Sequence, residues 1–189
     1  MTDTLIDPAR SALLLIDLQE RLLPAIDGGE QVVAAADWLA GVAHELGQPV
    51  HATEQYPERL GPTVAALARS VPASRRHTKM HFAWTRDPEA AGIRLPEQVV
   101  IAGTEAHVCV LQTALGLQQS GHQVFAVAEA VGSRRPADRE LALARMRQAG
   151  VVVAGAEMVA FEWLQCAGTE AFRRLLPRLR EGWQPAARS

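Results

Sequence analysis

Short apolar runs and helix-like segments alternate along almost the whole chain, and this alternation constrains the fold more than any other feature. The strand-like runs cover residues 11–18, 49–53, 75–80, 98–103, 123–128 and 151–154. Apolar residues at helical spacing occur in segments 30–46, 62–69, 108–119, 136–148, 161–164 and 170–176. Strict alternation predicts an α/β fold, in which a parallel sheet is covered by helices on both faces.

Composition limits the classes of function. The chain has 189 residues, 48% of them hydrophobic, and a net charge of −2. This length suits one domain, which we place at residues 1–180, with a frayed tail at 181–189. Because the charges are mixed in sign along the sequence, no nucleic-acid partner is expected.

Apolar runs and cysteines indicate in which cellular compartment the protein is expected. No run approaches the roughly 20 apolar residues of a membrane span, so no membrane partner is expected. The first apolar run is short and meets Asp17 at once, which is unlike a signal peptide. The two cysteines show no paired spacing, which favours a reducing compartment, and we expect a cytoplasmic protein.

Polar residues follow the strand-like runs. Asp17 ends the first, Lys79 the third, and Cys109 stands just after the fourth, at the start of a helix. In an open parallel sheet, ligands bind beyond the carboxyl ends of the strands, so these three side chains are expected at one edge. Lys79 is also the only lysine among 19 basic residues, which indicates either chance or a need for an ammonium that arginine cannot replace.

Cys109 allows two interpretations. It can be a small core residue, as most cysteines before an apolar helix are, just as Asp17 can simply cap a turn. Alternatively, the helix N-terminus and the Lys79 ammonium would lower the pKa of the thiol and favour a thiolate nucleophile. Asp17 could then carry the proton between the thiol and a leaving group, and N–H groups of the helix could bind an oxyanion.

Cofactor motifs are weak. His77 and His81 lie four residues apart, but no third ligand stands at a usual metal-binding spacing, and we predict no metal. The chain has no Gly-x-Gly-x-x-Gly, so we predict no cofactor of that kind or any other. Cys166 lies in an amphipathic region and is expected to be inert.

At these residues the sequence resembles the isochorismatase-like cysteine hydrolase family. The family's apolar-Asp-x-Gln strand is matched by LLLIDLQ with Asp17, its lysine by TKMHF with Lys79, and its Gly-x-Glu-x-x-x-Cys-Val segment by GTEAHVCV with Cys109. The resemblance spans about residues 11–161. It is especially close to the isochorismatase domain-containing proteins, through TEQYPERLGPTV and SRRPADRELALARMRQAG.

The resemblance implies a doubly wound, three-layer fold with six parallel strands in the order 3-2-1-4-5-6. It implies a catalytic triad of Asp17, Lys79 and Cys109. It also implies a non-proline cis peptide at Glu105–Ala106, and an oxyanion hole formed by the N–H groups of Ala106 and Cys109. Members of the family commonly assemble, so a homo-oligomer, a dimer or a tetramer, is expected.

The resemblance also narrows the reaction. Nicotinamidase-like members bind a metal through Asp-x-His, whereas Glu54-Gln55-Tyr56 stands here, and tyrosine is a poor ligand at neutral pH. We therefore expect a cysteine hydrolase that cleaves a small amide-like or acyl substrate through a thioester. The alternatives are a vinyl-ether hydrolase with Asp17 as general acid, and a non-catalytic oligomeric binding protein. Candidates for the substrate pocket are Gln19, Glu54, Tyr56, Phe82, Trp84 and His107.

Overall fold

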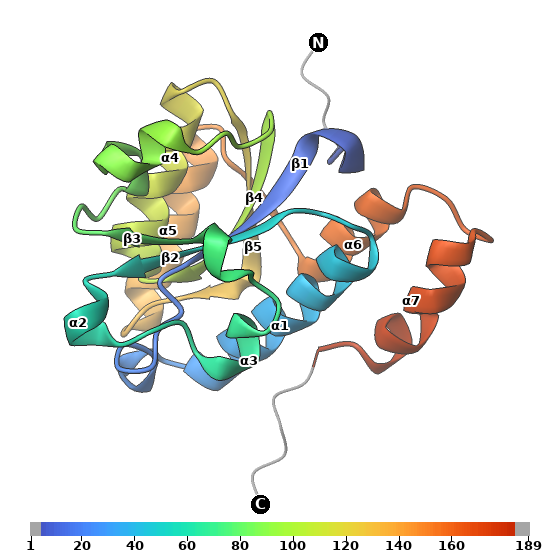
Figure 1. Cartoon of the computed structure of the whole chain (residues 1–189), viewed down its shortest axis with the longest axis horizontal. Coiled ribbons are helices and arrows are strands. Elements are labelled where there is room, and N and C mark those ends of the chain that lie inside the picture. The colour runs from blue at the N-terminus through green and yellow to red at the C-terminus, as the bar shows by residue number, and fades with distance from the viewer. Residues whose placement is uncertain (1–4, 184–189) are drawn as a thin grey trace, which may run out of the picture.

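A single parallel sheet organises the computed structural model, which describes residues 5–183. Its strands run in the order β3-β2-β1-β4-β5-β6, and every pair is parallel, which confirms the predicted topology (Figure 1). The strands are β1 Ser11–Ile16, β2 Val50–Gln55, β3 Arg76–Lys79, β4 Gln98–Thr104, β5 Gln123–Gly132 and β6 Val152–Ala154.

Helices cover both faces of this sheet, which gives the predicted three layers (Figure 1). α1 and α6 pack on one face, with α7 outside them, while α4 and α5 pack on the other. The helices are α1 Gly29–Glu45, α2 Pro57–Leu60, α3 Ala65–Ala68, α4 Leu111–Gln119, α5 Pro136–Gln148, α6 Ala156–Leu164 and α7 Glu170–Glu181. Single 3₁₀ turns are η1 Pro8–Arg10, η2 Leu23–Ala25, η3 Ala73–Arg75, η4 Trp84–Arg86 and η5 Pro88–Gly92, and η6 Ala106–Val110 is a π-helical turn.

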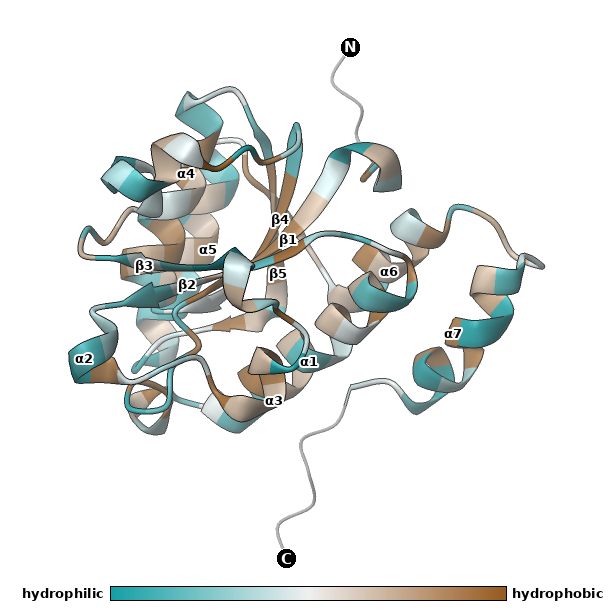
Figure 2. Ribbon diagram, in the orientation of Figure 1, coloured by the Kyte–Doolittle hydropathy of each residue, from teal (hydrophilic) through white to brown (hydrophobic). Residues whose placement is uncertain are grey.

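The apolar character of the strands explains the two cores. All residues of β1, β2 and β4 are buried, as expected for strands covered on both faces. Leu13 and Leu15 face the α1 side while Leu14 and Ile16 face the α4 side, because successive side chains of a strand point to opposite faces. Figure 2 shows β1 and β4 as mostly hydrophobic, whereas much of β2 is hydrophilic although it is buried.

Several predicted boundaries differ from the structure. β2 and β5 extend beyond 49–53 and 123–128. The helix predicted at 62–69 is shorter in the structure, where α3 covers 65–68, and α2 at 57–60 was not predicted. α7 does not end at 176, because Pro177 lies inside a helix that continues to Glu181. Apolar periodicity misses such ends because they are decided by tertiary contacts. The predicted frayed tail lies mostly outside the described residues, which end at 183.

Close contact between β1 and β4 shapes the edge where the site lies. Gly103 has a φ of +144°, and a Cβ at this position would lie 2.1 Å from the carbonyl oxygen of Ile16. Only glycine permits this approach. The next residue after Ile16 is Asp17, which has a φ of 53° and turns out of the strand.

No helix between residues 5 and 183 is long and apolar enough to cross a membrane.

Candidate active site

Asp17, Lys79 and Cys109 converge at the carboxyl edge of the sheet. Asp17 follows β1, Lys79 ends β3, and Cys109 lies in η6 after β4. Lys79 Nζ is 2.7 Å from Asp17 Oδ2, and both side chains are completely buried. Cys109 is 5% exposed, and its thiol lies close enough to Asp17 and Lys79 for both to act on its pKa. Three residues separated by 92 positions of sequence therefore form one contact group.

Asp17 is fixed by its neighbours. Its N–H donates to the carbonyl of Thr53, and the Thr53 hydroxyl donates to Oδ1 at 2.8 Å. The Thr104 hydroxyl donates to the Asp17 carbonyl at 2.7 Å. These contacts come from β2 and β4, the two strands that flank β1. The carboxylate is thus held in one orientation toward Lys79.

Lys79 is held by a glutamine that sequence reasoning did not assign to the site. Its ammonium donates to Gln55 Oε1 at 2.7 Å, and lies 3.4 and 3.3 Å from the carbonyl oxygens of His81 and Phe82. Gln55 is the register partner of Lys79 across β2 and β3. Its position one residue after Glu54 was visible in the sequence, but the pairing of strand ends was not. A buried ammonium needs such acceptors because desolvation without them is costly.

Burial determines the resting charge state of the group. Burial raises the pKa of Asp17, and the Lys79 ammonium opposes that rise. Burial also raises the pKa of Cys109 to about 12, with the charge of Asp17 acting in the same direction and that of Lys79 opposing it. The expected lowering of the Cys109 pKa is therefore wrong. The thiol is protonated at rest, because desolvation and Asp17 outweigh Lys79.

The turn that carries Cys109 also differs from expectation. The cis peptide lies between Thr104 and Glu105, so the predicted Glu105–Ala106 position is wrong by one residue. It coincides with the end of β4, and η6 begins directly after Glu105. The Glu105 carbonyl accepts from the N–H groups of Val108 and Val110. Among the described residues, no backbone hydrogen bond joins the N–H groups of Ala106 and Cys109 to a carbonyl outside η6.

Two predicted pocket residues are bound to the chain's own backbone. The buried Gln19 side chain accepts from the N–H of Gln55 and donates to the carbonyls of Gln55 and Gly61. The Glu54 carboxylate accepts from the N–H and hydroxyl of Thr63. Both side chains position the chain around the end of β2. Contact with a substrate stays a prediction for both.

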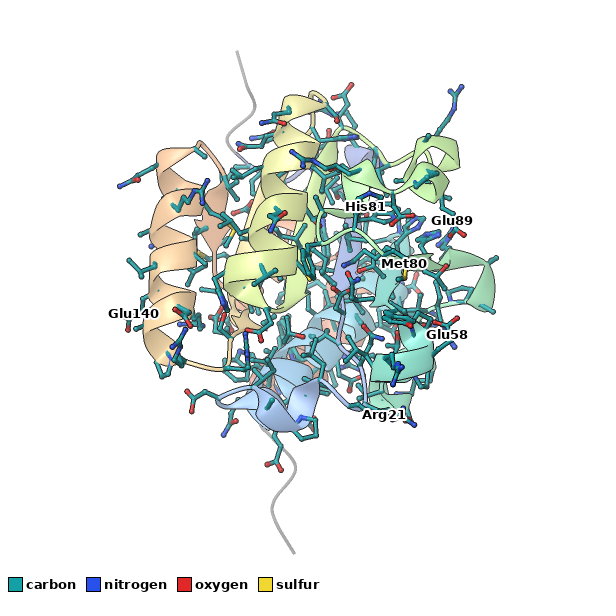
Figure 3. The ribbon with its side chains drawn as sticks, turned by 90° about the vertical axis from the view of Figure 1, so that its left-hand side faces the viewer. Arg21, Glu58, Met80, His81, Glu89 and Glu140 are labelled. Carbon is teal, nitrogen blue, oxygen red and sulfur yellow. The ribbon has the colours of Figure 1, made fainter. Side chains whose placement is uncertain are left out.

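Two other predicted pocket residues are exposed beside the triad. Phe82 is 55% and Tyr56 39% exposed, and they follow β3 and β2. Figure 3 shows Met80 and His81 near one another on the side of the molecule that faces the viewer. Trp84 is instead buried and stacked on His77, with ring centroids 5.3 Å apart.

His107 and the histidines near Lys79 have separate partners. His107 Nδ1 lies 3.0 Å from the Ser133 hydroxyl. His77 Nε2 lies 3.0 Å from His51 Nδ1, whereas His81 contacts Asp87. His77 and His81 therefore do not act as a pair. No group of three histidine, cysteine or acidic residues in the described part of the chain is arranged to hold a metal.

A large open groove lies elsewhere on the molecule. Its volume is about 1350 Å³, and it runs between α1, α3 and α7. Apolar side chains such as Trp38, Leu175 and Trp183 line it, together with acidic residues of α1. No member of the triad lines this groove, so its size does not bear on the chemistry at the sheet edge.

Comparison with known proteins identifies the family. The sequence model of the isochorismatase domain family matches residues 11–158. The chain is 36% identical over 174 residues to isochorismatase domain-containing protein 2A of Mus musculus, covering 92% of this chain and 84% of the relative. The chain belongs to the isochorismatase domain family. Its relatives also include isochorismatase domain-containing protein 2 of Danio rerio, 37% identical over 168 residues, with 87% of this chain and 84% of the relative covered.

Solved structures agree with this assignment. The MAR1 ribonuclease of Caenorhabditis elegans has a TM-score of 0.89 and 29% identity, with 98% of both chains covered. The ycaC gene product of Escherichia coli, described as an octameric hydrolase of unknown specificity, has a TM-score of 0.75 and 26% identity, covering 96% of this chain and 95% of that one. This isochorismatase-like chain is a hydrolase.

Proposed function

We propose that this hydrolase is cysteine-dependent and cleaves a small amide-like C–N bond, or a related acyl bond, through a thioester. The contact between the Cys109 thiol and the buried Asp17–Lys79 ion pair carries the proposal. A core-filling cysteine would not need a carboxylate and an ammonium beside it, because burying such a pair costs more than burying apolar groups.

The charge states suggest the order of steps. The resting thiol is neutral, so Asp17 accepts its proton as Sγ attacks the carbonyl carbon. The N–H groups of Ala106 and Cys109 bind the oxyanion. Collapse of this intermediate breaks the C–N bond, and Asp17 returns the proton to the departing amine. Water then attacks the thioester with Asp17 as base, which releases the acid and restores the thiol.

Lys79 supports both charged states of this cycle. Its ammonium favours the ionised form of Asp17 and so opposes the effect of burial, and it attracts the negative charge that develops on Cys109. The raised pKa of Asp17 suits this work, because a more basic carboxylate accepts the thiol proton more readily. Gln55 keeps the ammonium directed at the site.

The test compares variants on a panel of small amides, ureas and esters. Cys109→Ala should lose turnover by at least about 10³-fold, because the nucleophile is gone. Mass spectrometry of the native chain should show an acyl adduct on Cys109. Acrylamide is a useful further probe, since a related YcaC structure from Pseudomonas aeruginosa, with a TM-score of 0.77 and 25% identity, is described with a covalent acrylamide. Full turnover by Cys109→Ala would refute the proposal.

A vinyl-ether hydrolase is the second candidate. The raised pKa of Asp17 favours it, because burial makes the carboxyl easier to protonate, and a protonated carboxyl can donate its proton to an ether. In that case Cys109→Ala keeps most activity, whereas Asp17→Asn loses it. The same pair of variants therefore separates the two reactions.

The proposal also covers the class of substrate, the oligomeric state and the cellular compartment. The substrate is a small molecule, since the triad is buried and the chain carries a net charge of −2, which disfavours RNA although one structural relative is named a ribonuclease. We also propose that the chain forms a homo-oligomer in the cytoplasm. The octameric relative from Escherichia coli supports the first part, and two free cysteines are consistent with the second.

A further inference from the structure

The turn that carries the proposed oxyanion donors is tied to the loop between β5 and α5. Glu105 comes directly before Ala106 and directs its carboxylate at Arg134. The backbone N–H of Arg134 donates to Glu105 Oε2 at 3.3 Å, and its guanidinium Nε donates to Oε1. One arginine therefore binds both oxygens of the carboxylate.

A second contact joins the same two segments. His107 follows Ala106, and its Nδ1 lies 3.0 Å from the hydroxyl of the buried Ser133. The same nitrogen is 3.5 Å from Glu105 Oε2. Ala106 is thus flanked on both sides by residues that are held by the loop of Ser133 and Arg134.

Burial makes the charge of Glu105 important. Its side chain is 8% exposed, whereas that of Arg134 is 59% exposed. An unneutralised carboxylate at this position would oppose a negative oxyanion at the neighbouring N–H groups, because charges interact strongly where water is excluded. Arginine is suited to neutralise it, since it remains charged and matches a carboxylate with two donors.

We propose that Arg134 is a positioning residue for the reaction, which neutralises Glu105 and fixes the turn so that the N–H groups of Ala106 and Cys109 meet the oxyanion. The inference rests on the proposed function. It predicts that Arg134 affects acyl transfer but not the reactivity of the thiol itself, because the charges that act on the Cys109 thiol are those of Asp17 and Lys79.

Two reactions of Cys109 separate these effects, both measured in a Cys166→Ser background. Acylation by p-nitrophenyl acetate forms an oxyanion and releases nitrophenolate, whereas alkylation by iodoacetamide displaces iodide and forms none. Arg134→Met should slow acylation about 10- to 100-fold and leave alkylation within about twofold. The matched control is Arg135→Met, whose guanidinium binds Asp138 instead, and which should change neither rate.

A second substitution tests the charge argument. Glu105→Gln removes the carboxylate, so the double variant Glu105→Gln/Arg134→Met should acylate at least about fivefold faster than Arg134→Met alone. If Arg134→Met does not fold, Arg134→Lys takes its place, with acylation slowed about threefold or more and alkylation unchanged.

Three results overturn the inference: unchanged acylation in the Arg134 variant, an equal fall in acylation and alkylation, or no relief by Glu105→Gln. A different result bears on the proposed function. If the parent chain shows no nitrophenolate release beyond that of Cys109→Ala, cysteine-dependent acyl transfer itself fails, and the inference fails with it.

Discussion

At Cys109, burial and the Lys79 ammonium act on the pKa of the thiol in opposite directions. Sequence reasoning weighed only the helix N-terminus and Lys79, both of which favour a thiolate. The structure adds two effects that favour the thiol, the loss of water around the sulfur and the nearby Asp17 carboxylate. These are larger, so the residue is a latent nucleophile that requires Asp17 to take its proton during attack.

This charge state gives a direct prediction at the scale of a residue. A thiolate absorbs in the ultraviolet, so the difference in absorbance between the native chain and Cys109→Ala should stay flat from about pH 6 to about pH 10. The physical reason is a Cys109 pKa raised to about 12. A rise in this difference near neutral pH would show an ionised thiol at rest, and would contradict the mechanism proposed above.

At the scale of elements, β2, β3 and η4 share a stack of rings that the proposed mechanism does not use. His51 on β2 lies beside His77 on β3, and His77 stacks on Trp84 of η4. All three are buried. The stack lies beside Lys79, because His77 and Lys79 are two residues apart on the same face of β3. It therefore supports the loop whose carbonyls face the ammonium.

These histidines should make stability depend on pH. Burial lowers the pKa of His51 from 6.5 to about 4 and also lowers that of His77. The unfolded chain therefore binds more protons between these values, so this part of the stability is complete above about pH 6.5 and is lost as the pH falls toward about 4. For His51 alone the loss amounts to about 1–2 kcal/mol once solvent screening is taken into account.

The measurement is urea unfolding at about pH 7 and about pH 4. The free energy of unfolding should fall less in His51→Gln than in the native chain, by about 1–2 kcal/mol, because glutamine does not titrate. Both proteins carry the same carboxylates, so their contribution cancels when the fall in the variant is subtracted from the fall in the native chain. An equal fall in both proteins would show that His51 is not buried as a neutral ring.

At the scale of the whole molecule, several large apolar side chains are exposed. Met80 and Phe82 lie beside the triad, and Met158 and Phe161 lie on α6. Such side chains on a single chain are typical of surfaces that other chains cover. Sedimentation or light scattering should therefore give a mass of at least twice 20.4 kDa. A chain that stays monomeric at about 10 μM would contradict the proposed homo-oligomer.

Much of this protein followed from its sequence alone, because the controlling interactions are local or repeat along the chain. Apolar runs such as 11–18 and 98–103 predicted buried parallel strands, and the motifs around Asp17, Lys79 and Cys109 predicted which side chains would meet. The strand order rested on the resemblance. Boundaries such as the end of α7 were not predicted, since Pro177 is a local signal that packing overrides.

Other properties depended on neighbours that are distant in sequence. Gln55 reaches Lys79 only through the pairing of β2 with β3, and Arg134 reaches Glu105 only because α5 packs against η6. The protonation state of Cys109 depended on burial, which no local pattern encodes. Sequence determined which chemical groups the site contains, and tertiary structure decided their charges and partners, because desolvation and Coulomb interactions depend on distances in space.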